Sequence, residues 1–223
     1  HRLLQIEQGR SERLLLNILP APIAERLKNS NQPIVDGFAE VSVMFADIVN
    51  FTRVAEGLSP KQVFAILNKI FSCFDELAGK YGLEKIKTIG DAYMVAGGLN
   101  DTEGDYTESL AEMALEMCSL LHHDFNINEM HLDVRIGIGT GPVVAGVVGT
   151  KKFIYDLWGD TVNIASRITT EGVPGMVQVD ERSYRRLCSR FEFQAPQTIH
   201  LKGKGNMVVH RLVGRRDGHS TPI

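Results

Sequence analysis

The chain has few cysteines, and they are widely separated along its 223 residues. The three are Cys73, Cys118 and Cys188, and none belongs to a CxxC pair. An odd and dispersed set argues against both a disulfide framework and a zinc site. We therefore expect a reducing compartment, with the three thiols packed as small core residues.

Long apolar runs and an excess of basic charge are also missing. No segment approaches the roughly 18–20 apolar residues that a membrane-spanning helix needs, and no signal peptide is evident. The chain starts at His1 rather than Met, so we expect a fragment of a longer protein. Its net charge is −3, whereas proteins that bind nucleic-acid polymers usually carry a strongly basic stripe. A small anionic ligand remains compatible with this charge, because a few local cations can outweigh the average.

Two nucleotide-binding fingerprints are absent. The glycine-rich segment 137–142 reads GIGTGP, which is GxGxG rather than GxGxxG. It also lies between two predicted strands instead of opening a helix. The chain has no GxxxxGK[ST] segment either. The sequence therefore excludes a Rossmann dinucleotide site and a P-loop.

The composition is that of an ordinary globular domain, with 43% hydrophobic and 23% charged residues. From Glu40 onward, strand and helix patterns are interleaved. Strands are predicted over 41–47, 83–89 and 92–97, over two parts of 132–148 on either side of Gly139–Pro142, and over 197–201 and 207–213. Helices are predicted over 60–79, 107–122, 158–170 and 181–188. The frequent hairpins favour an α/β (α+β) sandwich with a largely antiparallel sheet over a doubly wound fold.

The first 30 residues have helical spacing and no strand alternation. The apolar pairs Leu14/Ile18 and Ile23/Leu27 are four residues apart, and Pro20 interrupts the pattern, so we expect two helices with a break near Leu19. An amphipathic helix packed on the domain and a dimerising stalk that carries a signal are both compatible with this pattern. The segment is too short for the three or four heptads that would indicate a coiled coil.

Two aspartates stand where strands are expected to end. Asp47 closes the strand 41–47, and Asp91 lies at the tip of the hairpin 83–97. If these strands are neighbours, both carboxylates reach the same end of the sheet. Such a pair suits Mg²⁺, which is bound by one or two acids together with water and substrate phosphates, and two such ions can clamp a phosphoryl displacement. Either aspartate alone could equally be a turn or capping residue.

Polar side chains of the helix 158–170 form a second candidate. Asn163 and Arg167 are four residues apart and therefore share a helix face. An amide and a guanidinium are good donors to ribose and phosphate oxygens, although a solvated polar face has the same pattern. Asp156 precedes the helix, and it is either a surface acid or an acceptor for the edge of a base.

Three cations complete the set of candidates. Lys87 lies four residues before Asp91, so the two side chains share a face of their predicted strand. Arg135 lies in an apolar strand, where a lone charge is costly unless it is paired, which makes it a candidate for an anionic ligand. Lys202 belongs to a flexible KGKG turn, for which an exposed loop is an equally good interpretation.

Four segments together resemble the class III nucleotidyl cyclases, and in particular their mycobacterial membrane-anchored and mammalian adenylyl members. They read FADIVNFT from Phe45, KTIGDAYM from Lys87, YDLWGDTVNIASR from Tyr155 and KGKG from Lys202. The resemblance runs from about residue 40 to 213 with the motifs in the family's order. It implies a ferredoxin-like βαββαβ domain.

The resemblance also implies roles for single residues. Two divalent metal ions, Mg²⁺ or Mn²⁺, would be held by Asp47, by Asp91 and by the backbone carbonyl of Ile48. Adenine would be bound by Lys87 and Asp156, with Leu157 beside them. The terminal phosphates would be held by Arg135 and Lys202. The resemblance implies that Asn163 orients the ribose and that Arg167 stabilises charge on the α-phosphate during in-line attack by the 3′-hydroxyl.

The base can be argued from hydrogen bonding. Lysine donates and aspartate accepts, which fits the N1 acceptor and N6 donor of adenine, whereas guanine reverses these edges. Guanylyl members of the family carry Glu and Cys at the positions of Lys87 and Asp156. We therefore expect ATP as the substrate, converted into 3′,5′-cyclic AMP and pyrophosphate. A guanylyl cyclase and a catalytically silent nucleotide-binding partner are the alternatives; a polymerase or diguanylate cyclase has no supporting motif.

The family builds its active site across a dimer interface, with the metal acids from one subunit and the base readers, Asn and Arg from the other. This chain carries both sets, which implies a symmetric homodimer and an inactive monomer. We expect a helical, signal-transducing segment over 1–39, the catalytic domain over 40–214 and a flexible tail over 215–223. The resemblance further implies a cytoplasmic domain of a membrane-anchored protein, with an upstream membrane or regulatory domain.

Overall fold

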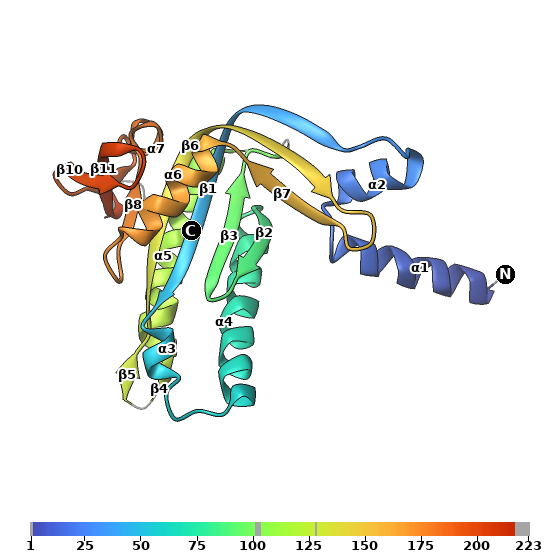
Figure 1. Ribbon diagram of the computed structural model, residues 1–223, viewed down its shortest axis with the longest axis horizontal. Helices are drawn as coiled ribbons and strands as arrows, with labels where there is room; N and C mark the ends of the chain where they lie inside the picture. Colours follow the sequence, from blue (N-terminus) through green and yellow to red (C-terminus); the bar gives the residue numbers. More distant parts are fainter. Residues whose placement is uncertain (1, 101–103, 128, 217–223) are drawn as a thin grey trace, which may run out of the picture.

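A computed structural model describes residues 2–100, 104–127 and 129–216 (Figure 1). Most of its strands join one sheet: β1 (Val35–Val49), β2 (Glu84–Ile89), β3 (Ala92–Gly97), β6 (Asp133–Val148), β7 (Ile154–Trp158), β8 (Val177–Val179), β9 (Phe191–Phe193), β10 (Gln197–Leu201) and β11 (Gly205–Arg215). A small separate hairpin is formed by β4 (Asn126–Ile127) and β5 (Met130–His131).

The sheet order is β10-β11-β8-β6-β1-β3-β2, with β7 paired to β6 and β9 to β11. Of the described strand pairs only β6 with β8 is parallel. The order β1-α4-β2-β3-α5-β6 along the chain gives a βαββαβ unit whose strands lie as β6-β1-β3-β2. The expected mixed fold with a largely antiparallel sheet is confirmed.

The helices are α1 (Arg2–Leu16), α2 (Ala21–Asn29), α3 (Phe51–Val54), α4 (Pro60–Lys80), α5 (Tyr106–Asp124), α6 (Asp160–Thr170) and α7 (Glu181–Leu187). Helix α4 begins at a capping box, in which Ser59 and Gln62 satisfy each other's backbone N–H groups, and Pro60 occupies the first turn. Helix α5 begins at Asp105, whose carboxylate accepts from the N–H groups of Thr107 and Glu108. These caps explain why both helices start close to the predicted residues.

Two core clusters lie on opposite faces of the sheet. Helices α4 and α5 cover one face through Phe74 and Leu110, which pack with Met44 and Ala46 of β1. The other face is covered by α6 and α2. Phe45, which lies between Met44 and Ala46 in β1, packs on this face together with residues of β7. Because successive strand residues point to opposite faces, Asp47, two residues after Phe45, points to the same face, toward α6.

The sequence prediction of two strands around Gly139–Pro142 is wrong, because β6 runs through the segment without a turn. The glycines serve close packing instead. A Cβ on Gly137 would stand 2.4 Å from Thr169 Oγ1, and one on Gly141 would stand 2.6 Å from Thr161 Oγ1, both on α6. Pro142 is tolerated because the pairing of β6 with β1 shifts register beside it, where a ladder hydrogen bond is not required.

The predicted break between two N-terminal helices is present, since α1 ends at Leu16 and α2 begins at Ala21. Helix α2 buries Ile23 and Ala24, while α1 has no buried residue and exposes Leu3 and Leu4. The predicted boundary after residue 39 lies inside β1, which begins at Val35. None of the helices in the described part of the chain is long and apolar enough to cross a membrane. The predicted tail of 215–223 begins inside β11, which ends at Arg215, and from 217 onward it lies outside the described residues.

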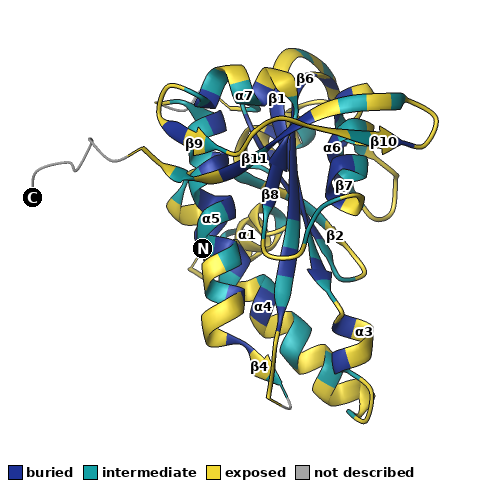
Figure 2. Ribbon diagram, turned by 90° about the vertical axis from the view of Figure 1, so that its left-hand side faces the viewer, coloured by how far each residue is buried: buried dark blue, intermediate teal, exposed yellow. Residues whose placement is uncertain are grey.

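The first half of β1, the second half of β6 and all of β7 form a twisted ribbon that runs past the body of the domain above α2 (Figure 1). Figure 2 shows that the middle strands are buried while the helical surfaces and the ends of the molecule are exposed. We call the ribbon formed by residues 35–38, 143–148 and 154–158 the arm.

Candidate active site

Asp47 and Asp91 are brought to the same end of the sheet. Asp47 lies opposite Ala92 in the pairing of β1 with β3, and Asp91 is the residue just before Ala92. The backbone N–H of Ile48 donates to the carbonyl of Asp91 over 3.2 Å, which fixes the hairpin tip beside the end of β1. Gly90 provides the positive φ of 58° that this tight turn requires. The convergence that the two sequence segments predicted is therefore present.

Arg135 lies against the first of these acids. In the pairing of β6 with β1 it stands opposite Asp47, and its Nε and Nη2 donate to Asp47 Oδ2 over 2.9 and 2.7 Å. Its Nη1 donates to the carbonyl of Thr170, at the end of α6, over 2.8 Å. The charge that lacked a partner in the sequence is thus paired across 88 residues.

The two carboxylates influence each other. Burial raises the pKa of Asp91, the negative charge of Asp47 adds to the increase, and the Arg135 guanidinium opposes it. A cation close to both carboxylates would oppose this increase, because an opposite charge favours the ionised form of an acid.

The donor set fits a hard divalent ion. Among the described residues there is no group of three or more His, Cys, Asp or Glu side chains that could hold a metal, so an all-protein zinc site is not present in this part of the chain. Mg²⁺ and Mn²⁺ prefer oxygen, and Mg²⁺ is commonly held by one or two carboxylates together with water and substrate phosphates. Asp47, Asp91 and the carbonyl of Ile48 could supply such oxygens.

Lys87 and Asp156 form the second part of the site. Lys87 Nζ donates to Asp156 Oδ2 over 2.6 Å, and the aspartate side chain is only 13% exposed. The other carboxylate oxygen accepts from the backbone N–H of Leu157 over 2.8 Å. Asp156 is therefore not a free surface acid. The side chain of Leu157 is buried in the core, so a ligand beside Asp156 would meet its backbone.

The third part lies on α6. Asn163 is exposed, and Arg167 Nη1 donates to the carbonyl of Lys202 over 2.5 Å. Lys202 lies in the turn between β10 and β11, where Gly203 has a φ of 79°. The helix and the basic turn, 35 residues apart, thus lie together as a donor group.

Sequence reasoning missed one contact of this group. Lys204 forms an ion pair with Asp160 at the start of α6, so the basic turn is attached to the helix at two points. The excess of charge in the KGKG turn was visible, but the position of its acidic partner depends on the hairpin fold.

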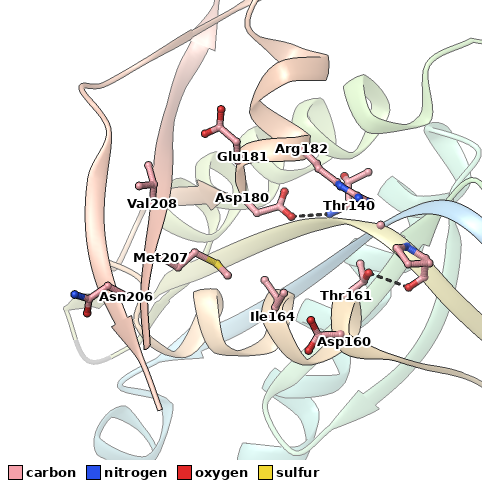
Figure 3. A pocket seen from close by; sticks show the side chains of 12 residues that line it. Thr140, Asp160, Thr161, Ile164, Asp180, Glu181, Arg182, Asn206, Met207 and Val208 are labelled. Atoms are coloured by element: carbon pink, nitrogen blue, oxygen red, sulfur yellow. Dashed lines mark hydrogen bonds between the residues drawn. The ribbon is translucent and has the colours of Figure 1, made fainter. Parts of the chain in front are cut away.

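A cavity of about 710 Å³ lies next to α6 (Figure 3). Its walls come from β6, α6, the start of α7 and β11. Two hydrogen bonds join residues of its wall, from the Thr140 N–H to Asp180 Oδ2 over 3.2 Å and from Thr161 Oγ1 to the Pro142 carbonyl over 2.9 Å. None of the described residues that line it is a predicted site residue, so the candidate site is not this cavity.

An exposed apolar surface surrounds Asp156 on the arm. Cross-strand partners share a face of a sheet, and the pairs of β6 with β7 that include and flank Asp156 are Val144/Trp158, Gly146/Asp156 and Val148/Ile154. The four apolar side chains in these pairs are all exposed, Trp158 at 43%. In the described chain, one side of the Lys87–Asp156 pair is therefore bordered by apolar residues that are exposed to solvent.

Known proteins resemble this chain over most of its length. The family model described as "Adenylate and Guanylate cyclase catalytic domain" matches residues 35–214. An adenylate cyclase of Mycobacterium tuberculosis is 44% identical over 214 residues, which is 96% of this chain and 48% of that protein. A membrane guanylyl cyclase of Dictyostelium discoideum is 40% identical over 205 residues, 91% of this chain and 14% of that protein. The chain thus spans about half, or less, of these curated relatives.

A solved structure has the same architecture. The guanylate cyclase domain of RhGC from Catenaria anguillulae, in complex with GTP, superimposes with a TM-score of 0.76 at 32% identity. The match covers 81% of this chain and 100% of that domain.

Proposed function

Because the chain belongs to the family of adenylate and guanylate cyclase catalytic domains, we propose that it converts ATP into 3′,5′-cyclic AMP and pyrophosphate. The observation that carries the choice of ATP is the contact between Lys87 and Asp156 at 2.6 Å. It places one donor and one acceptor side by side, and adenine offers the complementary acceptor N1 and donor N6. Guanine has an acceptor at O6 and a donor at N1. In the same orientation it would set a donor against Lys87 and an acceptor against Asp156.

Two divalent ions, Mg²⁺ or Mn²⁺, would be held by Asp47, Asp91 and the Ile48 carbonyl. When bound, they supply charge neutralisation on the triphosphate and favour ionisation of the ribose 3′-hydroxyl. The repulsion that raises the pKa of Asp91 beside Asp47, after the effect of burial, supports this assignment.

The other residues position the substrate and stabilise charge. The exposed amide of Asn163 would orient the ribose, and the guanidinium of Arg167 would bind the α-phosphate as negative charge develops on it. Lys202 and Arg135 would hold the terminal phosphates. The contact of Arg167 with the backbone of Lys202 supports a shared role, because it holds the guanidinium of α6 at the turn that carries this lysine. Such prepositioned donors can supply much of the rate enhancement of a phosphoryl transfer.

The site would be shared between two copies in a homodimer. The apolar surface around Asp156 supports this proposal, because an exposed patch that includes Trp158 and Ile154 is typical of an interaction site. A second copy would cover that surface and present its own Asp47 and Asp91 to the nucleotide held by Lys87 and Asp156. Two equivalent sites follow from the twofold symmetry, and a monomer would be inactive.

The activity of the whole protein is part of the proposal, since the chain covers 48% of its mycobacterial relatives. We propose that residues 1–39 connect the catalytic domain of 40–214 to an upstream membrane or regulatory domain, and that this domain faces the cytoplasm. The exposure of α1 supports a connecting role, because Leu3, Leu4 and Leu14 of this helix are exposed in the described chain.

The test is product formation by the purified chain with ATP and with GTP, in Mg²⁺ and in Mn²⁺, over a range of protein concentrations. We expect cyclic AMP from ATP, with a specific activity that rises with protein concentration. Cyclic GMP from GTP as the main product would replace the adenylyl assignment with the guanylyl one, to which the Dictyostelium relative points. No cyclic nucleotide from folded, dimeric protein would favour a silent nucleotide-binding partner.

A further inference from the structure

Arg135 uses three of its nitrogens on two different partners. Nε and Nη2 both donate to a single oxygen, Oδ2 of Asp47, while Nη1 donates to the carbonyl of Thr170. Thr170 is the last residue of α6, where carbonyls lack helical partners and the helix dipole is negative. One edge of the guanidinium is therefore held by the acid, and the other end by the helix.

The contact with Asp47 is incompatible with a metal at the same oxygen. A carboxylate oxygen has two lone pairs, and the two N–H donors of Arg135 occupy both on Oδ2. A dication bound there would also stand within a few ångströms of the guanidinium charge. The pair is only partly exposed, with 29% of the arginine and 21% of the aspartate side chain accessible, so water screens that repulsion incompletely.

Resting on the proposed two-metal function, we propose that Arg135 is a displaceable substitute for the metal, which neutralises Asp47 in the metal-free chain and is released when a divalent ion binds. The bond from Nη1 to Thr170 keeps the released guanidinium at the site, so that its Nε–Nη2 edge becomes free for the terminal phosphates of the nucleotide. The metal and the arginine thus compete for Oδ2 of Asp47, and metal binding makes the guanidinium available to the substrate.

This role has a consequence opposite to that of a fixed support. If Arg135 merely positions Asp47 for metal binding, its removal weakens metal binding. If it competes with the metal, its removal strengthens metal binding while it weakens binding of the nucleotide. The two affinities then change in opposite directions, which a general loss of structure would not produce.

The experiment measures Mn²⁺ binding to the full chain without nucleotide, by the electron paramagnetic resonance signal of free Mn²⁺. The variants are Arg135→Gln and Arg135→Lys, and folding is checked by circular dichroism and thermal melting. Arg211→Gln is the matched control, because Arg211 also lies on a strand and donates to a side-chain oxygen, that of Gln178, away from the acids. Binding of a non-cyclisable ATP analogue is measured in parallel at saturating Mn²⁺.

We expect Arg135→Gln to bind Mn²⁺ about tenfold more tightly than the unmodified chain, and to bind the analogue about tenfold more weakly. Arg135→Lys should lie between them, since one ammonium cannot contact both Asp47 and Thr170. Arg211→Gln should change neither affinity.

An unchanged or weaker Mn²⁺ affinity in folded Arg135→Gln protein would overturn the inference while leaving the proposed function in place. If neither the unmodified chain nor this variant bound Mn²⁺, and no cyclic nucleotide formed, the two-metal function itself would fall with it.

Discussion

Lys87 Nζ lies 2.6 Å from Asp156 Oδ2, although 69 residues separate them and they lie on β2 and β7, which are not hydrogen-bonded neighbours in the sheet. The pair satisfies itself without a ligand, so a base must exchange one hydrogen-bonded pair for two new contacts. A base with the wrong edge would leave a partly buried lysine or aspartate without a partner, which is costly. Discrimination between purines can therefore arise from these two side chains.

The first prediction exchanges Lys87 and Asp156, the two residues proposed to bind the base. Replacing Lys87→Glu together with Asp156→Cys should lower the ratio of kcat/KM for ATP over GTP by about 100-fold, because the site then accepts where it donated. Steady-state kinetics with both nucleotides give the ratio. The control is Lys85→Glu, on the same strand, whose lysine pairs with Asp75 on α4 at 2.8 Å. An unchanged ratio in the double variant would place base selection elsewhere.

A second prediction concerns Cys118. Burial raises the pKa of its thiol to about 12, and the negative charge of Asp133 adds to the effect. Since the folded pKa lies above the unfolded value of about 8.5, this group's contribution to stability is fully present below pH about 8.5. It is lost as the pH rises toward 12. In a variant with Cys73→Ser and Cys188→Ser, we expect slow reaction of Cys118 with a disulfide reagent at pH 9.

The control for this prediction is the same variant unfolded in urea, where the thiol should react at the fast rate of a free cysteine. Labelling of folded protein at the unfolded rate would show that Cys118 is accessible and ionised. It would then contradict the burial on which the pKa shift depends.

Local patterns predicted the longer helices and the hairpin 83–97 well, but they missed the short strands β7, β8 and β9 and gave little information on the contacts between elements. The helical spacing of 60–79 and the Gly90-Asp91 pair at the hairpin tip are signals between neighbouring residues, so the bounds of α4 and of the hairpin followed from the sequence. The convergence of Asp47 with Asp91 required only that two strands be neighbours. The partner of Arg135, in contrast, depends on the register between β6 and β1, which no local pattern encodes.

The glycines of β6 show why one local signal failed. A Gly-Thr-Gly-Pro segment is typical of a turn when its surroundings are unknown. Here the absent Cβ atoms admit α6, at distances that only the folded structure reveals. The same residues therefore carry a tertiary rather than a local requirement.

A third prediction follows from that packing. Gly137→Ala would place a Cβ within 2.4 Å of Thr169 Oγ1 and 2.6 Å of the Thr169 backbone nitrogen, so α6 must shift. We expect a loss of about 1–3 kcal/mol of stability from this overpacking, and a fall in kcat, since α6 carries Asn163 and Arg167. Gly214→Ala is the control, because its Cβ would meet no atom within 4 Å. Denaturant unfolding that gave equal stability for both variants would exclude tight packing at Gly137.

A fourth prediction addresses the acids. Asp47→Ala and Asp91→Ala should each reduce metal-dependent turnover by about 10³-fold or more, with melting temperatures within a few degrees of the unmodified chain. Both side chains lie at the end of the sheet, partly accessible to solvent, so neither holds the core. Activity is measured over a range of Mn²⁺ concentrations to separate weaker metal binding from loss of chemistry. Full activity in either variant at ordinary Mn²⁺ would exclude that residue as a ligand.

The last prediction tests whether sites are shared between copies. Under the proposed function, Asp47→Ala would lack a metal ligand and Asn163→Ala would lack a ribose contact, so each homodimer should be inactive. In an equal mixture, half of the dimers would be mixed, and each would contain one site with both defects and one intact site. One intact site of two in half of the dimers gives about a quarter of the original activity.

The matched control mixes Asp47→Ala with Asp91→Ala, in which every site lacks an acid and no activity should return. Because the two mixtures differ only in which half of the site is damaged, rescue in the first alone requires that acids and ribose contact come from different chains. Equal inactivity of both mixtures, with mixed dimers demonstrated by mass spectrometry, would instead place a complete site within one chain.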